Sequence, residues 1–146
     1  MDLHPMDLPR ALLFTEGMCY SPAHVAPALL TVMAGFQAAL AFGAPWGRAS
    51  YGGQHAGRLP GNLRAASALS VPVYLGAAAA LTSGRTPPNA RRLLNGVLTV
   101  VGAGGAVVNA LSPSWPERGW AVWSTGLVAS TIGGIRASST RGSRRA

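Results

Sequence analysis

The sequence predicts an all-α integral membrane protein, a bundle of four helices, and three observations predict it. Charged residues make up only 11% of the 146 residues, whereas soluble domains contain about 25%. No carboxylate occurs from residue 17 to residue 116. The charged residues leave uncharged segments of 31, 20, 24 and 17 residues, close to the roughly 20 that cross about 30 Å of hydrocarbon. A soluble helical protein rich in Ala and Gly is the alternative, but it would lack a charged surface.

Residues 1–23 are expected to form a short cytoplasmic segment ahead of the helices. This segment carries three of the four carboxylates, Asp2, Asp7 and Glu16. It lacks the basic start and the following apolar run of a signal peptide. Its repeated "MDL" leaves open whether the chain starts at Met1 or at Met6.

The first span is predicted over residues 24–43. Small residues recur in it every four positions, at Gly35, Ala39 and Gly43. Residues at this spacing share one helix face, and small ones there let a neighbouring helix approach closely. Gln37 is the one strongly polar side chain inside the span, and we expect it to face the other helices.

The second and third spans are predicted over residues 65–83 and 93–111, on either side of the turn "SGRTPPNARR". Pro72 lies inside the second span and is expected to kink it, because proline frees the carbonyl four residues earlier. Asn109 lies near the end of the third span. This span repeats the small-residue face, with Gly102, Ala106 and Ala110.

The fourth span is predicted over residues 115–135, with a third set of small residues, Gly126, Ser130 and Gly134. The preceding "SPSWPER" predicts a capping box, in which Ser114 caps the helix and Glu117 reaches back to it. Residues 136–146 are polar and basic with nothing to bury, and we expect this tail to be disordered.

The arginines predict the orientation of the four spans. Both termini and the turn between the second and third spans would share one side, which carries eight arginines against four on the other. The positive-inside rule places the richer side in the cytoplasm. The sequence therefore predicts a multi-pass cell-membrane protein with cytoplasmic N and C termini. Aromatic residues gather toward the outer side, as in an interfacial belt: Trp46, Tyr51, Trp115, Trp120 and Trp123.

Catalytic chemistry is not expected. After residue 16, the His, Cys and acidic residues are Cys19, His24, His55 and Glu117. General acid–base and metal chemistry need several such groups together, and the predicted topology puts His24 and His55 on opposite sides of a membrane. We therefore expect no catalytic residue, no metal site and no cofactor. The net charge of +8 does not predict a nucleic-acid partner, because arginines at span ends suit anionic lipid.

The loop at residues 44–64 is the strongest candidate for a binding site. It contains three arginines, a histidine and five glycines. Guanidinium groups and unobstructed backbone amides together suit an anionic ligand such as a lipid phosphate. The residues predicted to bind a ligand or lipid headgroup are Arg48, Arg58, Arg64, His55, Gly52 and Gly53. The plain alternative is that the arginines flank helices and the glycines only turn the chain.

The chain also resembles a family of small, uncharacterised four-span membrane proteins of actinobacteria and other bacteria. "AFGAPWGRASYGGQHAGRLPGNLRAAS" at residues 41–67 carries the resemblance, with a weaker echo in "SPSWPERGWAVW" at 112–123. The family suggests a lipid face richer in leucine, and two prolines after the loop's "LP", where this chain has Pro60 and Gly61. The resemblance implies the four-span architecture and the importance of the loop, and it implies no activity.

The expected function is that of a non-catalytic accessory or scaffold protein that binds lipid or a membrane partner through the 44–64 loop. The expected partners are membrane lipids, and either another membrane protein or further copies of this chain. A small transporter or channel subunit is the alternative, motivated by Gln37, Pro72 and Asn109 inside the spans. For Gln37 and Asn109 the plain role is hydrogen bonding between helices.

Overall fold

The computed structural model describes residues 22–143, and these residues form four α-helices and two short 3-10 turns. The α-helices are α1 (Pro22–Phe42), α2 (Gly61–Thr82), α3 (Pro88–Ala110) and α4 (Trp115–Ser143). The all-α prediction is confirmed for this part of the chain. The predictions for residues 1–21 and 144–146 lie outside the described residues.

Three of the helices are long and apolar enough to cross a membrane. They are α1 from His24, α2 and α3. α4 is longer than these but less apolar, and it is not among the three. Its sequence is rich in Ser, Thr and Gly and carries charged residues near both ends.

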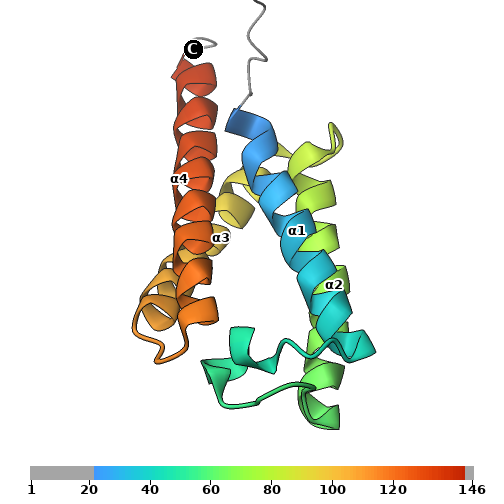
Figure 1. Cartoon of the computed structure of the whole chain (residues 1–146). Helices are drawn as coiled ribbons and strands as arrows, with labels where there is room; N and C mark the ends of the chain where they lie inside the picture. Colours follow the sequence, from blue (N-terminus) through green and yellow to red (C-terminus); the bar gives the residue numbers. More distant parts are fainter. Residues whose placement is uncertain (1–21, 144–146) are drawn as a thin grey trace, which may run out of the picture.

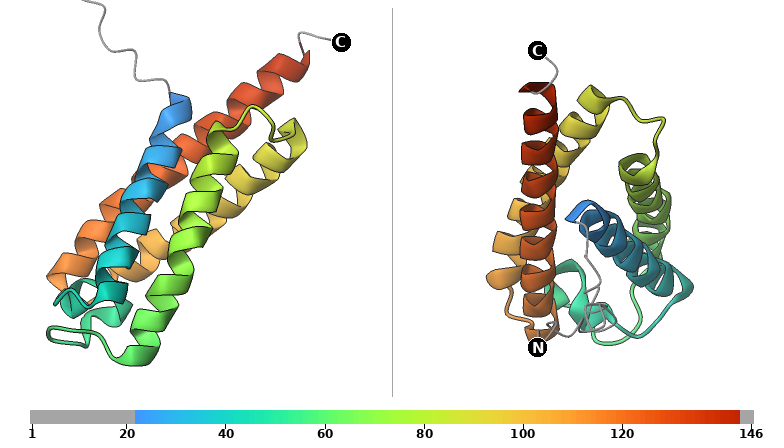
Figure 2. Two further views of the ribbon diagram at one scale, coloured as in Figure 1. Left: turned by 90° about the vertical axis from the view of Figure 1, so that its right-hand side faces the viewer. Right: turned by 90° about the horizontal axis from the view of Figure 1, so that it is seen from above.

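The helices pair as two antiparallel hairpins, α1 with α2 and α3 with α4 (Figure 1). α1 also lies against α4, and this contact joins the hairpins. α2 and α3 follow one another in the chain but make few contacts, and the view from above shows them splayed apart (Figure 2). The two hairpins are therefore held together mainly along α1 and α4.

Three helices begin earlier than predicted. The first of them, α1, begins at Pro22 rather than residue 24, so residues 22 and 23 are helical and do not belong to the predicted N-terminal segment. α2 begins at Gly61 rather than residue 65, and α3 begins at Pro88 rather than residue 93. The predicted starts of α2 and α3 followed the last arginine before each apolar segment. Arginine is a good helix former, and Pro88 suits the first helical position because its missing N–H would be unpaired there anyway. The helices therefore extend past their apolar segments.

α4 ends later than predicted. It continues to Ser143 instead of ending near residue 135, so residues 136–143 are helical and their predicted disorder is wrong. No proline follows residue 116, and Ala137 and Arg141 are favourable helix residues. A polar composition therefore does not exclude a continued helix.

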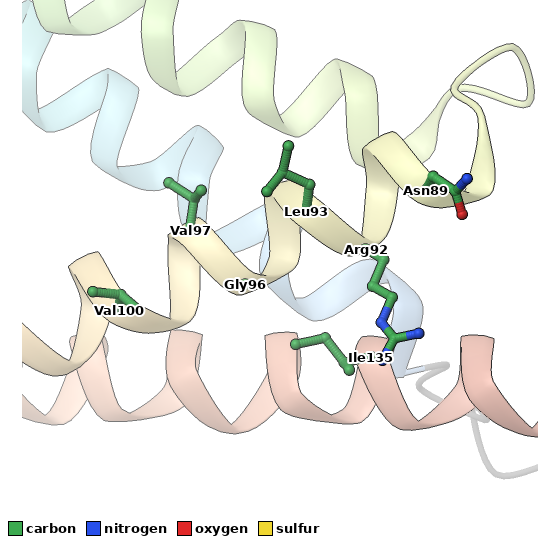
Figure 3. Close-up of a pocket in the computed structure, with 7 residues that line it drawn as sticks. All are labelled: Asn89, Arg92, Leu93, Gly96, Val97, Val100 and Ile135. Carbon is green, nitrogen blue, oxygen red and sulfur yellow. The ribbon is translucent and has the colours of Figure 1, made fainter.

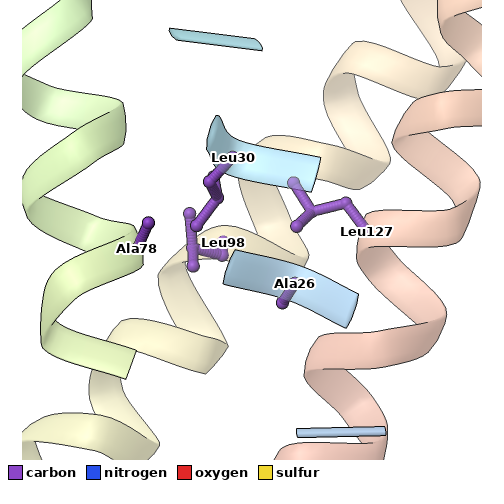
Figure 4. Packing of buried hydrophobic residues seen from close by; sticks show 5 residues of the cluster. All are labelled: Ala26, Leu30, Ala78, Leu98 and Leu127. Atoms are coloured by element: carbon purple, nitrogen blue, oxygen red, sulfur yellow. The ribbon is translucent and has the colours of Figure 1, made fainter. Parts of the chain in front are cut away.

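A small core joins all four helices. It consists of Ala26, Leu30, Ala78, Leu98 and Leu127 (Figure 4). Leu30 is fully buried, and Leu29, Tyr74 and Trp123 are among the side chains that pack around the cluster. In a lipid environment such contacts stabilise by close packing, because lipid is as apolar as the core.

Only two of the three predicted small-residue faces lie against another helix. Gly102 of α3 is buried, and a Cβ there would lie 3.0 Å from the Val128 side chain of α4. A Cβ at Gly134 of α4 would lie 3.1 Å from the Asn95 side chain. Gly35 of α1 is exposed, with no atom within 4 Å of its Cβ position. The buried face of α1 is instead formed by Ala26, Leu30, Ala34 and Leu40.

Hydroxyl groups provide a polar contact between α3 and α4. The Oγ1 atoms of Thr99 and Thr131 are 2.8 Å apart, and Thr131 is fully buried. Each hydroxyl also lies within hydrogen-bond distance of a carbonyl oxygen of its own helix, that of Asn95 or Leu127. Because a hydroxyl has one proton, one of the two donates to the other hydroxyl while the second donates to its carbonyl. Some of the polar side chains that lower the hydropathy of α4 are therefore inside the protein.

Candidate functional site

The loop between α1 and α2 folds over the end of the helices at which α3 finishes and α4 begins (Figure 1). We call residues 43–60 the cap. It contains the short turns η2 (Gly47–Ala49) and η3 (Tyr51–Gly53), and both contact α4. The cap is shorter than the predicted 44–64 loop because residues 61–64 belong to α2. The predicted loop is therefore a folded element with a defined position on the helices.

Two glycines allow the tight path of the cap. The Gly47 N–H donates to the Gly57 carbonyl oxygen at 2.8 Å. A Cβ at Gly47 would lie 2.5 Å from the His55 carbonyl oxygen and 2.7 Å from that of Gly57. Gly53 has a φ of +67° and lies directly against Ser114. Only glycine fits these close approaches.

Glu117 holds the cap against the start of α4. Its side chain is 4% exposed, and its Oε1 accepts a hydrogen bond from the Gly52 N–H at 2.7 Å. Its Oε2 accepts a hydrogen bond from the Ser112 hydroxyl at 2.5 Å. Glu117 is the only carboxylate from residue 17 to the end of the chain. Because hydrogen bonds to a charged group are stronger than neutral ones, this residue is the main polar attachment of the cap.

The predicted capping box is therefore wrong in its bonds, although α4 does begin at Trp115. The Ser114 hydroxyl donates to the Arg48 carbonyl oxygen instead of accepting from the helix. The Ser112 hydroxyl accepts from the Ser114 N–H at 3.1 Å. The cap brings the Gly52 N–H and the Arg48 carbonyl oxygen to the start of α4. These backbone groups bond to Glu117 and Ser114, the two side chains that a capping box would have used.

Aromatic side chains complete the attachment of the cap. The Trp120 Nε1–H donates to the Ala49 carbonyl oxygen at 3.0 Å, and the Tyr51 hydroxyl lies 3.0 Å from the Ser67 hydroxyl of α2. The Phe36 ring lies between Trp46 and Trp120, with centroids 6.0 and 4.5 Å away. The cap is therefore bonded to both α2 and α4 and stacked on α1.

Two of the predicted binding arginines bond to the end of α1. Arg64 Nε donates to the Ala41 carbonyl oxygen at 3.0 Å. Arg58 lies over Gly43, and its guanidinium group is 3.5 Å from the Phe42 carbonyl oxygen. The last carbonyls of a helix lack partners inside the helix and carry partial negative charge. The structure thus gives both arginines a role at this helix end, and separates them from Arg48.

The other predicted site residues lie in different surroundings. Arg48 is exposed, and His55 is half-buried with its backbone against Gly47. Gly52 is exposed, but its N–H is taken by Glu117. Arg48 and Arg58 are the two exposed arginines of the cap, and of these only Arg58 bonds to the end of α1.

The outer rim of the cap is aromatic and basic. Trp115 is 79% exposed, and Trp46 and Tyr51 are also exposed. The Arg118 guanidinium lies 5.5 Å from the centroid of the Trp115 ring, a cation–π contact, and its Nε bonds the Ser112 carbonyl oxygen at 2.9 Å. Exposed aromatic rings beside arginines suit the headgroup layer of a membrane.

The predicted intramembrane polar residues lie apart from the cap contacts. Gln37 is half-buried on α1, and its Oε1 atom is buried without a hydrogen-bond partner. Asn109 is half-buried, one residue before the end of α3. Within residues 22–143, no group of three His, Cys, Asp or Glu side chains is arranged to hold a metal ion.

Sequence reasoning missed the residues that attach the cap. Glu117 was placed in a capping box, and Ser112 and Trp120 were given no contact with the loop. One signal was available, because Glu117 is a lone carboxylate in a long acid-free region. Such an isolated acid near an apolar segment needs a partner, but the sequence does not identify the Gly52 N–H as that partner.

No protein-family model matches the chain, and no curated protein or solved structure matches it either.

Proposed function

We propose that the protein is a non-catalytic integral membrane protein of the bacterial cell membrane, with four spans and both termini in the cytoplasm. Its surface supports this proposal, because large aliphatic side chains are exposed along α2 and α3. They include Leu69, Val73, Leu75, Leu93, Val97, Val100, Val101, Val107 and Val108. Water would disfavour such a surface, and exposed apolar patches of this extent indicate contact with lipid or protein.

The fourth span in this proposal is α4. Its 29 residues extend about 43 Å at roughly 1.5 Å per residue, which exceeds the hydrocarbon thickness of about 30 Å. It packs along α3 over the same depth. Its Ser124 and Thr131 are buried, so these two polar side chains lower its hydropathy without facing lipid. A helix with its polar groups turned inward can face lipid with its remaining side chains.

We further propose that the protein is an accessory or scaffold protein, and that the cap recognises anionic headgroups. The attachment of the cap by Glu117 is the observation that carries this proposal, because a preorganised surface binds without the cost of ordering a loop. The exposed recognition groups are Arg48 and Trp46 of the cap, together with Trp115 in the adjoining first turn of α4. A membrane protein partner that uses the same surface is the other outcome of the test.

Tryptophan fluorescence tests the cap directly, because all four tryptophans lie in the cap or in the first three turns of α4. The protein is reconstituted in vesicles that contain brominated phosphatidylglycerol or brominated phosphatidylcholine, whose bromines quench nearby tryptophans. We expect stronger quenching by the anionic lipid, and loss of this preference in Arg48→Gln. Arg85→Gln, in the distant α2–α3 turn, is the control. Equal quenching by both lipids in the unaltered protein would contradict headgroup recognition by the cap.

A small transporter or channel subunit is the second candidate. It is supported by the buried Gln37 Oε1 atom, which has no hydrogen-bond partner and could accept one from a passing solute. Solute flux into liposomes that disappears in Gln37→Leu would favour this candidate. Flux that is absent, or that persists in Gln37→Leu, would count against it.

A further inference from the structure

A groove lies on α3 at the end of the helices opposite to the cap (Figure 3). Its volume is about 630 Å³. Leu93, Val97 and Val100 of α3 and Ile135 of α4 form its apolar lining. Gly96 lies among them and has no side chain, and no atom lies within 4 Å of its Cβ position. The groove is therefore shallow and open along α3, and Leu93, Val97 and Val100 are themselves exposed.

The polar groups of the groove lie at one end. Asn89 and Arg92 are in the first turns of α3, and both are exposed. The close-up shows the Arg92 side chain reaching beside Ile135 (Figure 3). The neighbouring Arg91 is used elsewhere, because its terminal nitrogen donates to the Ser83 carbonyl oxygen at 2.6 Å. Arg92 is therefore the cation that the groove itself presents.

The length of the groove matches one leaflet of a membrane. Asn89 and Val100 are 11 residues apart, about 16 Å along an α-helix. Half of a hydrocarbon core of roughly 30 Å is about 15 Å. With Arg92 at the headgroup level, the apolar lining would reach close to the middle of the bilayer. The polar end and the apolar lining are thus arranged as in a single phospholipid.

The charge around the groove favours an anionic occupant. Arg85, Arg91, Arg92 and Arg136 are all at this end of the helices. The only carboxylate after residue 16, Glu117, is at the opposite end under the cap. Within residues 22–143, no carboxylate side chain lies at this end to compete with a phosphate for the forked guanidinium donors of Arg92.

We propose that this groove binds one anionic phospholipid. The phosphate bonds Arg92 and the Asn89 amide, and one acyl chain lies over Gly96 against Leu93, Val97 and Val100. This site would be in the leaflet opposite to the cap, and it does not depend on lipid recognition by the cap. The occupant is a lipid rather than a soluble anion because the apolar lining continues along α3 for about two turns beyond Arg92.

Native mass spectrometry of the full chain in detergent micelles tests the proposal, with dioleoyl phosphatidylglycerol or dioleoyl phosphatidylcholine added. We expect one tightly bound phosphatidylglycerol and weaker phosphatidylcholine binding. Arg92→Gln should weaken phosphatidylglycerol binding about tenfold, since a hydrogen bond to a charged group contributes roughly that factor. Arg85→Gln removes the same charge from an exposed position outside the groove and should have a much smaller effect.

A second pair of variants tests the shape of the groove. Gly96→Leu would fill the recess without a clash, and Gly104→Leu adds the same side chain at an exposed position of α3 with no atom within 4 Å of its Cβ. We expect only Gly96→Leu to lower binding of both lipids. Equal effects of Arg92→Gln and Arg85→Gln, or full binding by Gly96→Leu, would overturn the proposal. A dimer that Gly96→Leu dissociates would also overturn it, because the groove would then hold a second copy of the chain.

Discussion

The Oε1 atom of Glu117 accepts a hydrogen bond from the backbone N–H of Gly52 at 2.7 Å, across 65 residues of sequence. This bond joins the loop of the first hairpin to the first turn of α4. The hairpins also meet along α1 and α4, whereas α2 and α3 make few contacts with each other. One carboxylate therefore both fixes the shape of the cap and links the two halves of the protein.

Replacement of Glu117 by alanine is expected to release the cap. The change removes two hydrogen bonds to a charged group, and it leaves the Gly52 N–H and the Ser112 hydroxyl without that partner. The free energy of opening the cap should fall by about 3 kcal/mol. Trypsin cleaves after arginine, so cleavage after Arg48 and Arg58 should become roughly a hundredfold faster where opening precedes cleavage.

Two comparisons make this proteolysis experiment specific. Cleavage after Arg85, in the α2–α3 turn, provides an internal reference and should not change. Glu117→Gln retains an acceptor for Gly52 and should show a smaller increase than Glu117→Ala. If cleavage after Arg85 accelerates as much as cleavage after Arg48, Glu117 stabilises the whole protein and not the cap in particular.

Replacement of Gly47 by alanine should destabilise the cap from within. The new Cβ would lie 2.5 Å from the His55 carbonyl oxygen, so the backbone must move and weaken the bond between Gly47 and Gly57. We expect a cost of about 1–3 kcal/mol, the usual range for overpacking. Gly61→Ala adds the same methyl group with no atom within 4 Å. The measurement is the midpoint of thermal unfolding in detergent. The same midpoint for both variants would contradict the close approach at Gly47.

The contact between α3 and α4 predicts that leucine is destabilising at one glycine of α3 and tolerated at another. Gly102→Leu would place its Cβ 3.0 Å from Val128, and the two helices would have to separate. The loss of stability should again be about 1–3 kcal/mol. Gly104→Leu should be neutral or slightly stabilising, because leucine favours a helix more than glycine. Equal unfolding curves in a detergent titration would show that Gly102 is not at a close helix contact.

Much of the fold could be predicted from the sequence because charge patterning marks long apolar helices. The α-helical class and the first three apolar segments follow from it, whereas the start of α4 at Trp115 follows from the "SPSWPER" motif. The ends of the helices were less well predicted. Arg64, Arg91 and Arg92 were left out of the predicted spans because they are charged. Arginine is nevertheless a good helix former. Charge patterning therefore locates the apolar part of a helix and not its true ends.

Less of the candidate site could be predicted, since it depends on contacts between distant segments. Composition identified the 44–64 loop as unusual. It did not show that Arg58 and Arg64 reach the carbonyls of α1, or that Glu117 reaches Gly52. A small-residue pattern also did not show which faces are used, because Gly35 and Gly102 fit the same pattern while only Gly102 is buried. Which of these residues form bonds, and which helix faces are buried, depends on how the hairpins pack.

The hydroxyl pair on α3 and α4 predicts a measurable coupling. Thr99 and Thr131 have their Oγ1 atoms 2.8 Å apart, and each can be replaced by valine with little change in shape. A double-mutant cycle of Thr99→Val and Thr131→Val should give a coupling of about 0.6 kcal/mol, as for other hydrogen bonds between membrane helices. The coupling is obtained from the free energies of unfolding of the unaltered protein, the two single variants and the double variant. Strictly additive effects would mean that the two hydroxyls do not interact.

The proposed topology predicts which positions a membrane-impermeant maleimide can label in intact cells. Each position is tested as a single cysteine in a Cys19→Ser background. Gln54→Cys is on the exposed part of the cap and should be labelled from outside. Gly84→Cys, exposed in the α2–α3 turn, should be protected until the cells are opened.

A third position decides whether α4 is a span. Ser143 is the last residue of α4, so Ser143→Cys shares the side of Gly84 if α4 crosses the membrane and the side of Gln54 if it does not. We expect protection in intact cells, because α4 runs antiparallel to α3 over the same depth. Labelling at residues 54 and 143 without labelling at 84 would reduce the protein to three spans. Labelling at 84 and 143 without labelling at 54 would invert it and place the cap in the cytoplasm.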